Sequence, residues 1–349
     1  MSFSEKILAW YRQNKRELPW RNTIDPYNIW LSEIMLQQTR VAQGIPYYNK
    51  FIDVFPTVYD LSNAKEEQVL KLWQGLGYYS RARNLHAAAK MVVEEYNGVF
   101  PRSYKELLTL KGVGDYTASA IASICYNAPH AVVDGNVYRV LSRYFGVETP
   151  INSTSGMKYF KELAQELLHA TEIRDYNQGI MEFGAIQCTP QSPACSSCPL
   201  NDGCIALKEE KVKELPVKIK KTKIRKRYFN YLIPIYKDGE NERYTLLRQR
   251  RGKGIWQNLW EFPLLESDRE IGLENIEEKY KDVLETSRAD KITLYNDSFI
   301  VHKLSHQHLY TKFWILEGTD RLKEGINVSK LDNYAVPVLL ADFMKTFKF

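Results

Sequence analysis

The sequence predicts a multidomain chain, in which an all-α domain is followed by a smaller α+β domain, and three observations support this. At 349 residues the chain is long enough for about two domains with separate cores. Residues 1–205 consist mostly of amphipathic segments separated by Gly, Pro and Asn, a pattern typical of helices. From about residue 229 the pattern changes to short strands with an Asp-Gly turn.

The composition is that of a globular protein, because 44% of the residues are hydrophobic and 26% are charged. Residues 1–18 contain no apolar run long enough for a signal peptide or a membrane span. We therefore expect a soluble cytoplasmic protein with no membrane partner, whose thiols stay reduced.

The first candidate for chemistry lies in the helical run expected over 25–43, DPYNIWLSEIMLQQTRVAQ, which an Asp-Pro pair opens as cap and first-turn proline. Glu33 shares a helical face with Trp30 and Gln37. A carboxyl group in such apolar surroundings has a raised pKa and can hold a proton near neutral pH. The alternative is a buried glutamate that pairs with an arginine.

The segment 110–123, LKGVGDYTASAIAS, places two glycines ahead of an Ala-rich apolar helix. Gly112 and Gly114 can take backbone angles that other residues resist, and they let another chain approach closely. The N–H groups at the following helix start form an anion site. Taken alone, the G-x-G pattern would also suit a tight turn between two packed helices.

Asp134 is expected at the start of the helix within 130–147, HAVVDGNVYRVLSRYFGV. A carboxylate there accepts backbone N–H bonds and lies at the positive end of the helix, so we expect it to stay ionised. A plain helix cap would show the same sequence.

Four of the five cysteines fall within 188–204, CTPQSPACSSCPLNDGC, and the fifth, Cys125, belongs to an apolar run and is expected in the core. The spacing is C-x6-C-x2-C-x5-C, formed by Cys188, Cys195, Cys198 and Cys204. Thiolates select zinc or an iron–sulfur cluster. Structural zinc sites more often pair two short C-x2–4-C knuckles, so one central C-x2-C favours a [4Fe–4S] cluster over zinc, with a disulfide pair less favoured still.

The segment 211–228, KVKELPVKIKKTKIRKRY, carries nine Lys or Arg and one Glu, a net charge of +8 in a chain of net charge +6. It is either a solvated linker or a strap that faces nucleic acid. Beyond it, YFNYLIPIY, KDGENE and RYTLLRQR predict a strand, a turn and a strand, and KITLYN and LYTKFWILEG continue in that style. The predicted parts are thus a helical domain over 1–210, a linker over 211–228 and an α+β domain over 229–349.

The cysteine loop, the hairpin pattern L-x-G-V-G-x-Y-T-A and the two carboxyl groups together resemble the adenine (MutY-type) branch of the helix–hairpin–helix iron–sulfur DNA glycosylases. The resemblance spans essentially the whole chain, strongly over 17–204 and loosely beyond 229. It implies a [4Fe–4S] cofactor and a hairpin that grips a DNA phosphate. It also implies a base excision repair enzyme, which flips adenine mispaired with 8-oxoguanine or guanine out of double-stranded DNA and hydrolyses its N-glycosidic bond. We expect a monomer.

The resemblance also implies roles for individual residues. Glu33 matches the general acid/base, Asp134 the stabilising carboxylate and Asn136 a nearby hydrogen-bonding partner. These roles suit the chemistry, since the purine must be protonated to leave and the sugar passes through an oxocarbenium-like cation. Tyr116 stands where endonuclease III-like lyases have the lysine that forms a Schiff base, so a monofunctional glycosylase with little strand cleavage is expected.

Residues expected to contact DNA or the base come from several segments. In 73–85, WQGLGYYSRARNL, the resemblance makes Tyr78 the residue inserted beside the partner base, at a turn that contains Leu76 and Gly77. The other candidates are Trp20 and Arg21 in ELPWR, Gln38 and Thr39 in LQQT, and Gln178 as a reader of the adenine edge.

The C-terminal domain resembles MutT-type (Nudix) hydrolases over 254–266, GIWQNLWEFPLLE, but the R-E-x2-E-E box that would bind magnesium and pyrophosphate is missing. A catalytically inactive reader is therefore expected. HKLSHQHL is similar to the family's Phe-Ser-His loop, which recognises 8-oxoguanine, so Ser305 and His306 are the expected contacts, and Leu304 replaces the usual Phe.

Three alternatives stay open at this point. His302, His306 and His308 would share one face of an extended strand and could bind a metal. An endonuclease III-like glycosylase/lyase is disfavoured by Tyr116 and by the second domain. A non-catalytic iron–sulfur DNA-binding or redox-sensing regulator would have no need of an acid at Glu33.

Overall fold

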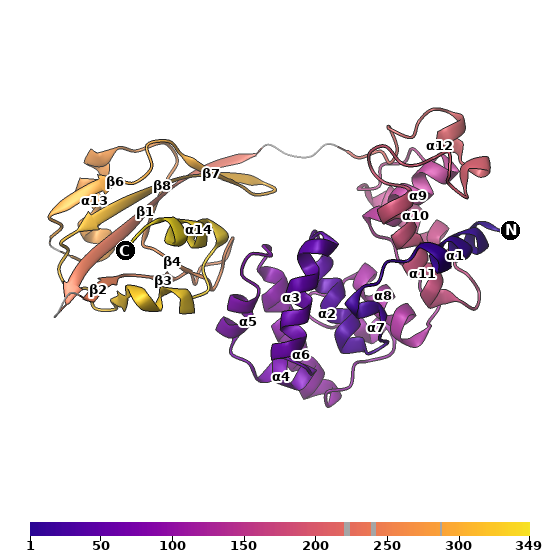
Figure 1. Ribbon diagram of the computed structural model, residues 1–349, viewed down its shortest axis with the longest axis horizontal. Helices are drawn as coiled ribbons and strands as arrows, with labels where there is room; N and C mark the ends of the chain where they lie inside the picture. Colours follow the sequence, from indigo (N-terminus) through magenta and orange to yellow (C-terminus); the bar gives the residue numbers. More distant parts are fainter. Residues whose placement is uncertain (220–223, 239–241, 287) are drawn as a thin grey trace. The chain divides into compact units, whose positions relative to one another are not determined.

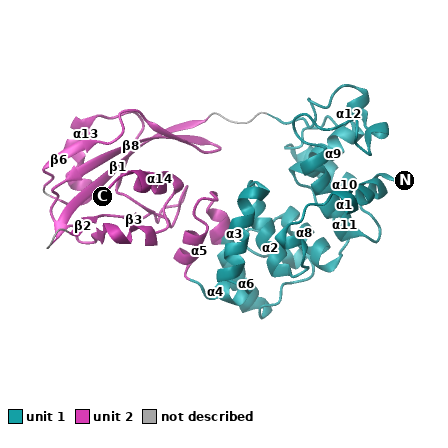
Figure 2. Ribbon diagram, viewed as in Figure 1, with its two compact units in different colours: residues 1–64, 84–220 teal, residues 65–83, 221–349 magenta. Residues whose placement is uncertain are grey.

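The structure is a computed structural model, which describes all residues except 220–223, 239–241 and 287 (Figure 1). The chain divides into two compact units, of which unit 1 comprises residues 1–64 and 84–220, and unit 2 comprises residues 65–83 and 221–349 (Figure 2). The predicted change from helices to strands along the chain is confirmed (Figure 1).

Helices make up the regular structure that is described for unit 1. They are α1 (Phe3–Asn14), α2 (Pro26–Leu36), α3 (Val41–Val54), α4 (Val58–Asn63), most of α6 (Ser80–Tyr96), α7 (Tyr104–Leu107), α8 (Asp115–Tyr126), α9 (Gly135–Phe145), α10 (Thr154–Glu166), α11 (Ile173–Glu182) and α12 (Ile205–Lys208). Short helical turns lie at Pro19–Arg21, Phe183–Gln187 and Asn201–Gly203.

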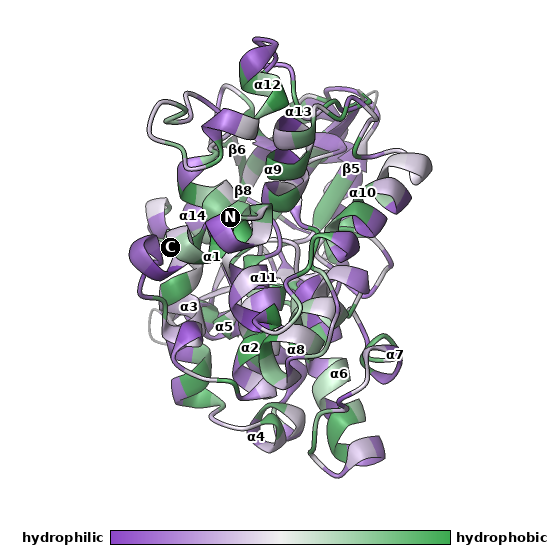
Figure 3. Cartoon of the chain, turned by 90° about the vertical axis from the view of Figure 1, so that its right-hand side faces the viewer, coloured by the Kyte–Doolittle hydropathy of each residue, from purple (hydrophilic) through white to green (hydrophobic). Residues whose placement is uncertain are grey.

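Helix α8 is central to unit 1, because it packs against both α2 and α11. Its residues 117–125 are all buried, and most of them are Ala or Ser, which lets the neighbouring helices approach closely. Hydrophobic residues also run along α2 (Figure 3). This arrangement brings side chains of α2, α8 and α11 to one place.

The helical run expected over 25–43 is broken in the structure. Helix α2 ends at Leu36, and α3 begins at Val41. Between them Gln38 has a φ of 56°, in the left-handed region that a helix interior excludes. Gln38 and Thr39 therefore lie in the turn that follows α2, the helix that carries Glu33.

Unit 2 contains the strands, helix α13 between β5 and β6, helix α14 after the last strand and a helical segment from the N-terminal half of the chain. Its strands are β1 (Arg225–Asp238), β2 (Glu242–Thr245), β3 (Arg248–Gln249), β4 (Trp260–Glu261), β5 (Leu264–Ser267), β6 (Lys291–Leu294), β7 (Ile300–Lys303), β8 (Gln307–Glu317) and β9 (Ile326–Asn327). Its helices are α5 (Glu66–Leu72), the first turn of α6, α13 (Leu273–Leu284) and α14 (Val338–Thr346).

The centre of the sheet is the parallel pair β1 and β8, whose register runs from Arg225 opposite Gln307 to Ile235 opposite Glu317. The strand order is β6-β8-β1-β2-β9, while β5 also pairs with β1 and β7 with β8. A parallel pair needs a long crossover connection, which here contains α13. The predicted β1–β2 hairpin is present as an antiparallel pair, and its turn residues 239–241 lie outside the described residues.

Helices α13 and α14 cover opposite faces of this sheet. Trp314 of β8 belongs to a buried cluster with Ile276 and Tyr280 of α13. The preceding residue, Phe313, stacks on Phe343 of α14 with ring centroids 4.1 Å apart. Because consecutive strand residues point to opposite faces, unit 2 has three layers, helix, sheet and helix.

The boundaries of the two units differ from the expected domain boundaries in two places. Strand β1 begins at Arg225, inside the segment expected to be a linker. Residues 65–83, which the sequence placed in the helical domain, cluster with the C-terminal sheet (Figure 2).

Candidate active site

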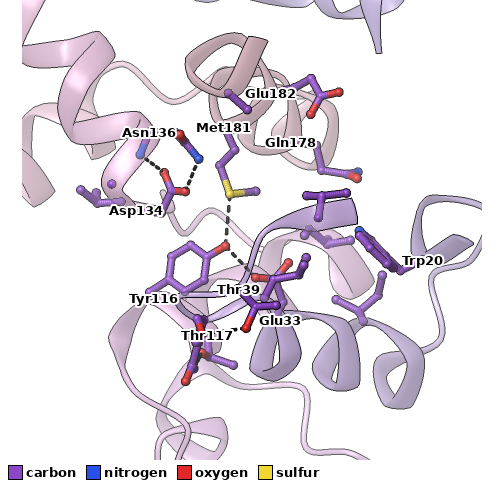
Figure 4. Close-up of a pocket in the computed structure, with 18 of the residues that line it drawn as sticks. Trp20, Glu33, Thr39, Tyr116, Thr117, Asp134, Asn136, Gln178, Met181 and Glu182 are labelled. Atoms are coloured by element: carbon purple, nitrogen blue, oxygen red, sulfur yellow. Dashed lines mark hydrogen bonds between the residues drawn. The ribbon is translucent and has the colours of Figure 1, made fainter. Parts of the chain in front are cut away.

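A cavity of about 740 Å³ in unit 1 is lined by residues of α2, α8, α9 and α11 and of the segments that connect them (Figure 4). It collects the following predicted site residues: Trp20, Arg21, Glu33, Gln38, Thr39, Gly112, Gly114, Tyr116, Asp134, Asn136 and Gln178. Leu76, Gly77, Tyr78, Ser305 and His306 belong to unit 2.

Glu33 is buried on α2 and lies against Tyr116, the second residue of α8. The Tyr116 hydroxyl donates a hydrogen bond of 2.6 Å to Glu33 Oε2. Burial raises the pKa of Glu33 to about 7, the negative charge of Asp134 adds to this rise, and the Tyr116 hydrogen bond opposes it. The predicted rise is confirmed, and the hydrogen bond described for the carboxyl group comes from a tyrosine rather than an arginine.

Tyr116 is suited to donate a proton in a hydrogen bond without losing it. Burial, followed by the charges of Glu33 and Asp134, raises the pKa of Tyr116 well above its usual value, so the hydroxyl stays neutral. The sulfur of Met181 on α11 lies 3.2 Å from the same oxygen. A thioether sulfur is only a weak acceptor, so the carboxyl group of Glu33 is the stronger partner for the single hydroxyl proton.

Asp134 caps α9, as predicted. Its Oδ1 accepts hydrogen bonds from the backbone N–H groups of Asn136 and Val137 at 2.9 and 2.8 Å, and its Oδ2 accepts one of 2.8 Å from Asn136 Nδ2 (Figure 4). Burial nevertheless outweighs these bonds, so the pKa of Asp134 is raised rather than lowered. The position of Asp134 at the helix start was predicted, whereas the direction of its pKa shift differs from the expectation.

Glu182 at the end of α11 is a site residue that the sequence did not reveal. Arg16 donates two side-chain hydrogen bonds to its carboxylate at 2.7 and 2.6 Å, and Arg21 donates two more at 3.0 and 2.7 Å. Although burial acts in the opposite direction, these bonds hold the pKa of Glu182 at about 2. Gln178, four residues earlier on the same helix face, lines the cavity beside it.

Trp20 forms part of the cavity wall and directly precedes Arg21 in the sequence. It is buried and meets Tyr48 edge to face, with ring centroids 5.2 Å apart. Figure 4 shows Trp20 among the residues that line the cavity.

The two hairpin glycines are glycine for different reasons. Gly112 has a φ of 76°, and a Cβ there would lie 2.7 Å from the Cβ of Asn84, so both its conformation and its space exclude a side chain. Gly114 caps α8 with a φ of −100°, which any residue can adopt, and a Cβ there would meet nothing within 4 Å. The expectation of unusual backbone angles therefore holds for Gly112 and is wrong for Gly114, which leaves open space at the helix start.

The four clustered cysteines line one small cavity in the loop 188–204, together with apolar side chains such as Leu207 and Val212. Arg143 of α9 donates to Thr189 O at 2.7 Å, and its guanidinium lies 3.4 Å from Cys188 Sγ. In the described parts of the chain, no three His, Cys, Asp or Glu side chains are gathered closely enough for a single metal ion. Four thiols around a space with few other polar groups suit a multi-iron cluster.

Arg139 connects the cysteine loop to the cavity. Its guanidinium donates to Cys188 O at 2.7 Å and to Asn136 Oδ1 at 2.9 Å. Asn136 in turn bonds Asp134. Helix α9 thus carries the Asp134 cap at its first turn and holds the cysteine loop one turn later.

The predicted insertion turn is exposed in unit 2. Gly77 and Tyr78 have φ values of 73° and 48°, and Tyr78 is 48% exposed. Its hydroxyl lies 2.7 Å from the Ser305 hydroxyl, so the structure brings together two residues that were predicted from separate segments. Leu76 beside them is buried, and His306 is exposed.

The expectation that three histidines share one strand face is wrong. His302 lies on β7 and His308 on β8, the two strands pair antiparallel, and His306 lies in the turn between them. His302 is half-buried against Trp256, with ring centroids 5.7 Å apart, and burial lowers its pKa.

None of the helices in the described part of the chain is both long enough and apolar enough to cross a membrane.

Three family models match parts of the chain, and the first includes residues 65–83, which the structure groups with unit 2. Residues 31–167 match the HhH-GPD superfamily of base excision DNA repair proteins, residues 188–204 match the iron–sulfur binding domain of endonuclease III, and residues 233–346 match the NUDIX domain.

Full-length relatives and solved structures agree with these matches. The adenine DNA glycosylase of Buchnera aphidicola subsp. Baizongia pistaciae is 37% identical over 317 residues, which cover 90% of this chain and 86% of that protein. That of Mus musculus is 46% identical over 214 residues, covering 59% of this chain and 42% of that protein. The structure of a thermostable thymine-DNA glycosylase has a TM-score of 0.55 and 34% identity, and it covers 59% of this chain and 95% of that one. An endonuclease III–DNA complex shares the fold, with a TM-score of 0.52 and 24% identity over 59% of this chain and 94% of that one.

With its buried acid, its capped aspartate and its cysteine loop, the chain belongs to the adenine DNA glycosylase family within the HhH-GPD superfamily, and is a DNA-binding N-glycosylase of base excision repair with an iron–sulfur binding domain.

Proposed function

We propose that this chain removes adenine that is paired with 8-oxoguanine or guanine in duplex DNA, with Glu33 as the general acid. The observation that supports this most directly is the pKa of Glu33, which burial places at about 7 while Asp134 lies in the same cavity. A cavity of about 740 Å³ is large enough to receive a flipped nucleoside.

The chemistry starts with a proton on Glu33. Near neutral pH a substantial fraction of Glu33 is protonated, and the carboxylic acid can donate to a ring nitrogen of the adenine. The bond between the sugar C1′ and the base then breaks, and its electron pair leaves with the protonated base. The hydrogen bond from Tyr116 stabilises the carboxylate that remains.

Asp134 then faces the positive charge that develops on the sugar. Three hydrogen bonds from Asn136 and Val137 fix its carboxyl group at the helix start, so it needs no rearrangement as the cation forms. Glu33, now a carboxylate, can take a proton from the water that attacks C1′. Tyr116 offers no amine at this position, so a Schiff base does not form there.

The adenine edge is recognised by Gln178 on α11. Glu182 is held ionised by Arg16 and Arg21, whose five hydrogen bonds occupy both carboxylate oxygens, so it fixes the end of α11 beside the cavity. Gln178 lies beside it with both a donor and an acceptor, and Trp20 supplies an aromatic wall.

The substitution Glu33→Gln tests this function in single-turnover release of adenine from a duplex with adenine opposite 8-oxoguanine. Loss of the acid should slow release by ~10²–10⁴-fold, while binding to the same duplex changes little. Glu95→Gln, an exposed position on α6, is the matched control and should behave as the unmodified chain does. A Glu33→Gln protein within threefold of the unmodified rate would show that Glu33 is not the acid.

The loop 188–204 is proposed to hold a [4Fe–4S] cluster through Cys188, Cys195, Cys198 and Cys204. The cluster would tie a loop of little regular structure to α9, where Arg143 contacts the same loop. About four irons per chain and a brown colour are expected of the purified protein. One zinc per chain without visible absorption would contradict this.

The opposite base is proposed to be read by Ser305 and His306, with Tyr78 inserted beside it. The support is the 2.7 Å contact between the Tyr78 and Ser305 hydroxyls on an exposed surface of unit 2. The basic segment 211–228 would add phosphate contacts, which strengthen binding without reading sequence. Changing Ser305 and His306 together to Ala should lower the preference for 8-oxoguanine over guanine by about 5- to 100-fold and leave release opposite guanine in place. A monomer is expected in sedimentation with and without DNA.

A further inference from the structure

A line of polar contacts joins the segment 65–83 to the C-terminal sheet, on the side of unit 2 that carries Tyr78. Glu66 Oε1 accepts a hydrogen bond of 2.6 Å from Asn258 Nδ2, and Glu67 Oε1 accepts one of 2.7 Å from the indole N–H of Trp260. Arg83, at the other end of the segment, donates to Gln257 O at 2.9 Å. These three contacts bind α5 and the start of α6 to β4 and to the turn before it.

A second line of contacts runs beside the first, along residues 334–336. Lys71 donates to Tyr334 O at 3.0 Å, and Tyr79 donates to Val336 O at 3.4 Å. The backbone N–H of Trp260 donates to Ala335 O at 2.8 Å, so the backbone segments 257–260 and 334–336, which make these contacts, lie next to each other. We call both lines together the docking seam, which comprises residues 66, 67, 71, 79 and 83 on one side and 257, 258, 260, 334 and 336 on the other.

The turn before β4, which contributes Gln257 and Asn258 to the docking seam, has an unusual backbone conformation. Trp256 and Asn258 have φ values of 59° and 66°, in the left-handed region that residues other than glycine rarely adopt. Such conformations persist when surrounding contacts over-determine them, and they concentrate at functional positions. Here the backbone N–H of Asn258 donates to Arg250 O at 2.7 Å, while its side-chain amide and the neighbouring Gln257 carbonyl contact Glu66 and Arg83.

The docking seam lies close in sequence to the insertion turn, which contains Gly77 and Tyr78. Only five residues separate Leu72, the end of α5, from Tyr78, and Arg83 follows Tyr78 by one helical turn and a residue. Seam contacts therefore flank the turn on both sides. Between them, the Tyr78 hydroxyl lies 2.7 Å from the Ser305 hydroxyl.

We propose that Glu66 and Glu67 are positioning residues for the choice of the opposite base. They dock the insertion turn on the C-terminal domain before DNA binds, so that Tyr78 and the Ser305 turn meet the DNA as one preassembled element. Because the two turns are already ordered in the folded protein, DNA binding does not have to supply the entropy cost of ordering them. This inference rests on the proposed function for its effect on base choice, whereas the docking itself does not.

The consequence is selective. Ser305 is proposed to contact the opposite base, whereas the residues proposed to break the N-glycosidic bond line the cavity of unit 1. Loosening the docking seam should therefore reduce release opposite 8-oxoguanine and leave release opposite guanine nearly unchanged. Because a hydrogen bond to a charged group is involved at each acid, the preference should fall by about 5- to 20-fold in the double variant Glu66→Ala, Glu67→Ala.

The first measurement is hydrogen exchange of the full chain without DNA, read by mass spectrometry. In Glu66→Ala, Glu67→Ala the amides of 65–79 and of 256–261 should lose protection together, while those of α8 keep theirs. Trp260→Phe removes the indole donor and keeps a ring, so it should loosen the same two segments. Glu67→Gln retains an acceptor oxygen and should restore most of the protection. Glu95→Ala, on the exposed face of α6, controls for the loss of one negative charge.

The second measurement is single-turnover adenine release opposite 8-oxoguanine and opposite guanine with the same proteins. A lower ratio in the alanine and phenylalanine variants, with recovery in Glu67→Gln, supports the proposal. Unchanged protection of 65–79, or a loosened seam with an unchanged ratio, overturns it. If the unmodified chain released no adenine from either duplex, the proposed function would fall, and the exchange result would still decide whether the seam docks the turn.

Discussion

The hydrogen bond between Tyr116 and Glu33 should set the pH at which the enzyme loses activity. Tyr116→Phe removes the hydroxyl that donates to Glu33 Oε2 at 2.6 Å and keeps the ring. This hydrogen bond stabilises the ionised carboxylate and therefore lowers the pKa of Glu33 against the effect of burial. Without it, the carboxyl group should hold its proton to higher pH.

The size of the change follows from the bond's strength. A hydrogen bond to a charged group contributes about 1.5–3 kcal/mol, and one pKa unit corresponds to about 1.4 kcal/mol. The pKa of Glu33, about 7 in the unmodified chain, should therefore rise by about one to two units. Because a general acid works in its protonated form, the alkaline limb of the rate profile should move upward by the same amount.

The assay is single-turnover adenine release between about pH 5 and pH 10, with the limb fitted for each protein. Tyr138→Phe is the matched control, since Tyr138 lines the same cavity and no hydrogen bond to Glu33 is described for it. Its limb should stay near the position found for the unmodified chain. A Tyr116→Phe limb that stays in place, or that moves to lower pH, would refute the assignment of this bond to the acid.

Three further outcomes are expected. Gly112→Ala should destabilise the protein by about 1–2 kcal/mol in urea unfolding, because the φ of 76° at Gly112 is left-handed. Gly114→Ala should leave the stability unchanged, and it should weaken DNA binding if a phosphate approaches this helix start. Glu182→Gln should lower the free energy of unfolding by about 3 kcal/mol or more, because it leaves two guanidinium groups without their carboxylate. Arg139→Gln should slow adenine release more than it weakens DNA binding, because it frees Asn136 beside Asp134; equal losses in both would contradict this.

The residues of the cavity were predictable where the signal is local. The raised pKa of Glu33 was predictable because apolar neighbours on its own helix indicate a buried segment, and the cap at Asp134 follows from its position before a helical run. The net pKa direction of Asp134 was not predictable, because burial by other elements outweighs its local hydrogen bonds. Local chemistry can be read from spacing, whereas the depth of burial is a result of packing.

Contacts between distant segments explain what the sequence could not predict. Glu182 is 166 residues from Arg16 and 161 from Arg21, so nothing in the spacing of these charges indicates that they meet. The acids of α5, Glu66 and Glu67, have the composition of a solvated helix surface, yet both accept hydrogen bonds from the C-terminal part of the chain. The fold class was predictable, because it depends on the periodicity of whole segments.

The discontinuous make-up of unit 2 bears on how this protein can be cut and recombined. A truncated chain that ends near residue 228 would lack the sheet, and its residues 65–83 would also lose the surface on which they lie. Its altered base choice would then combine the loss of the Ser305 turn with a displaced Tyr78. Conversely, transplanting the C-terminal domain onto another helical glycosylase should confer its selectivity only if α5 and the turn after it are transplanted as well. The natural module for such chimeras is therefore two stretches of sequence rather than one.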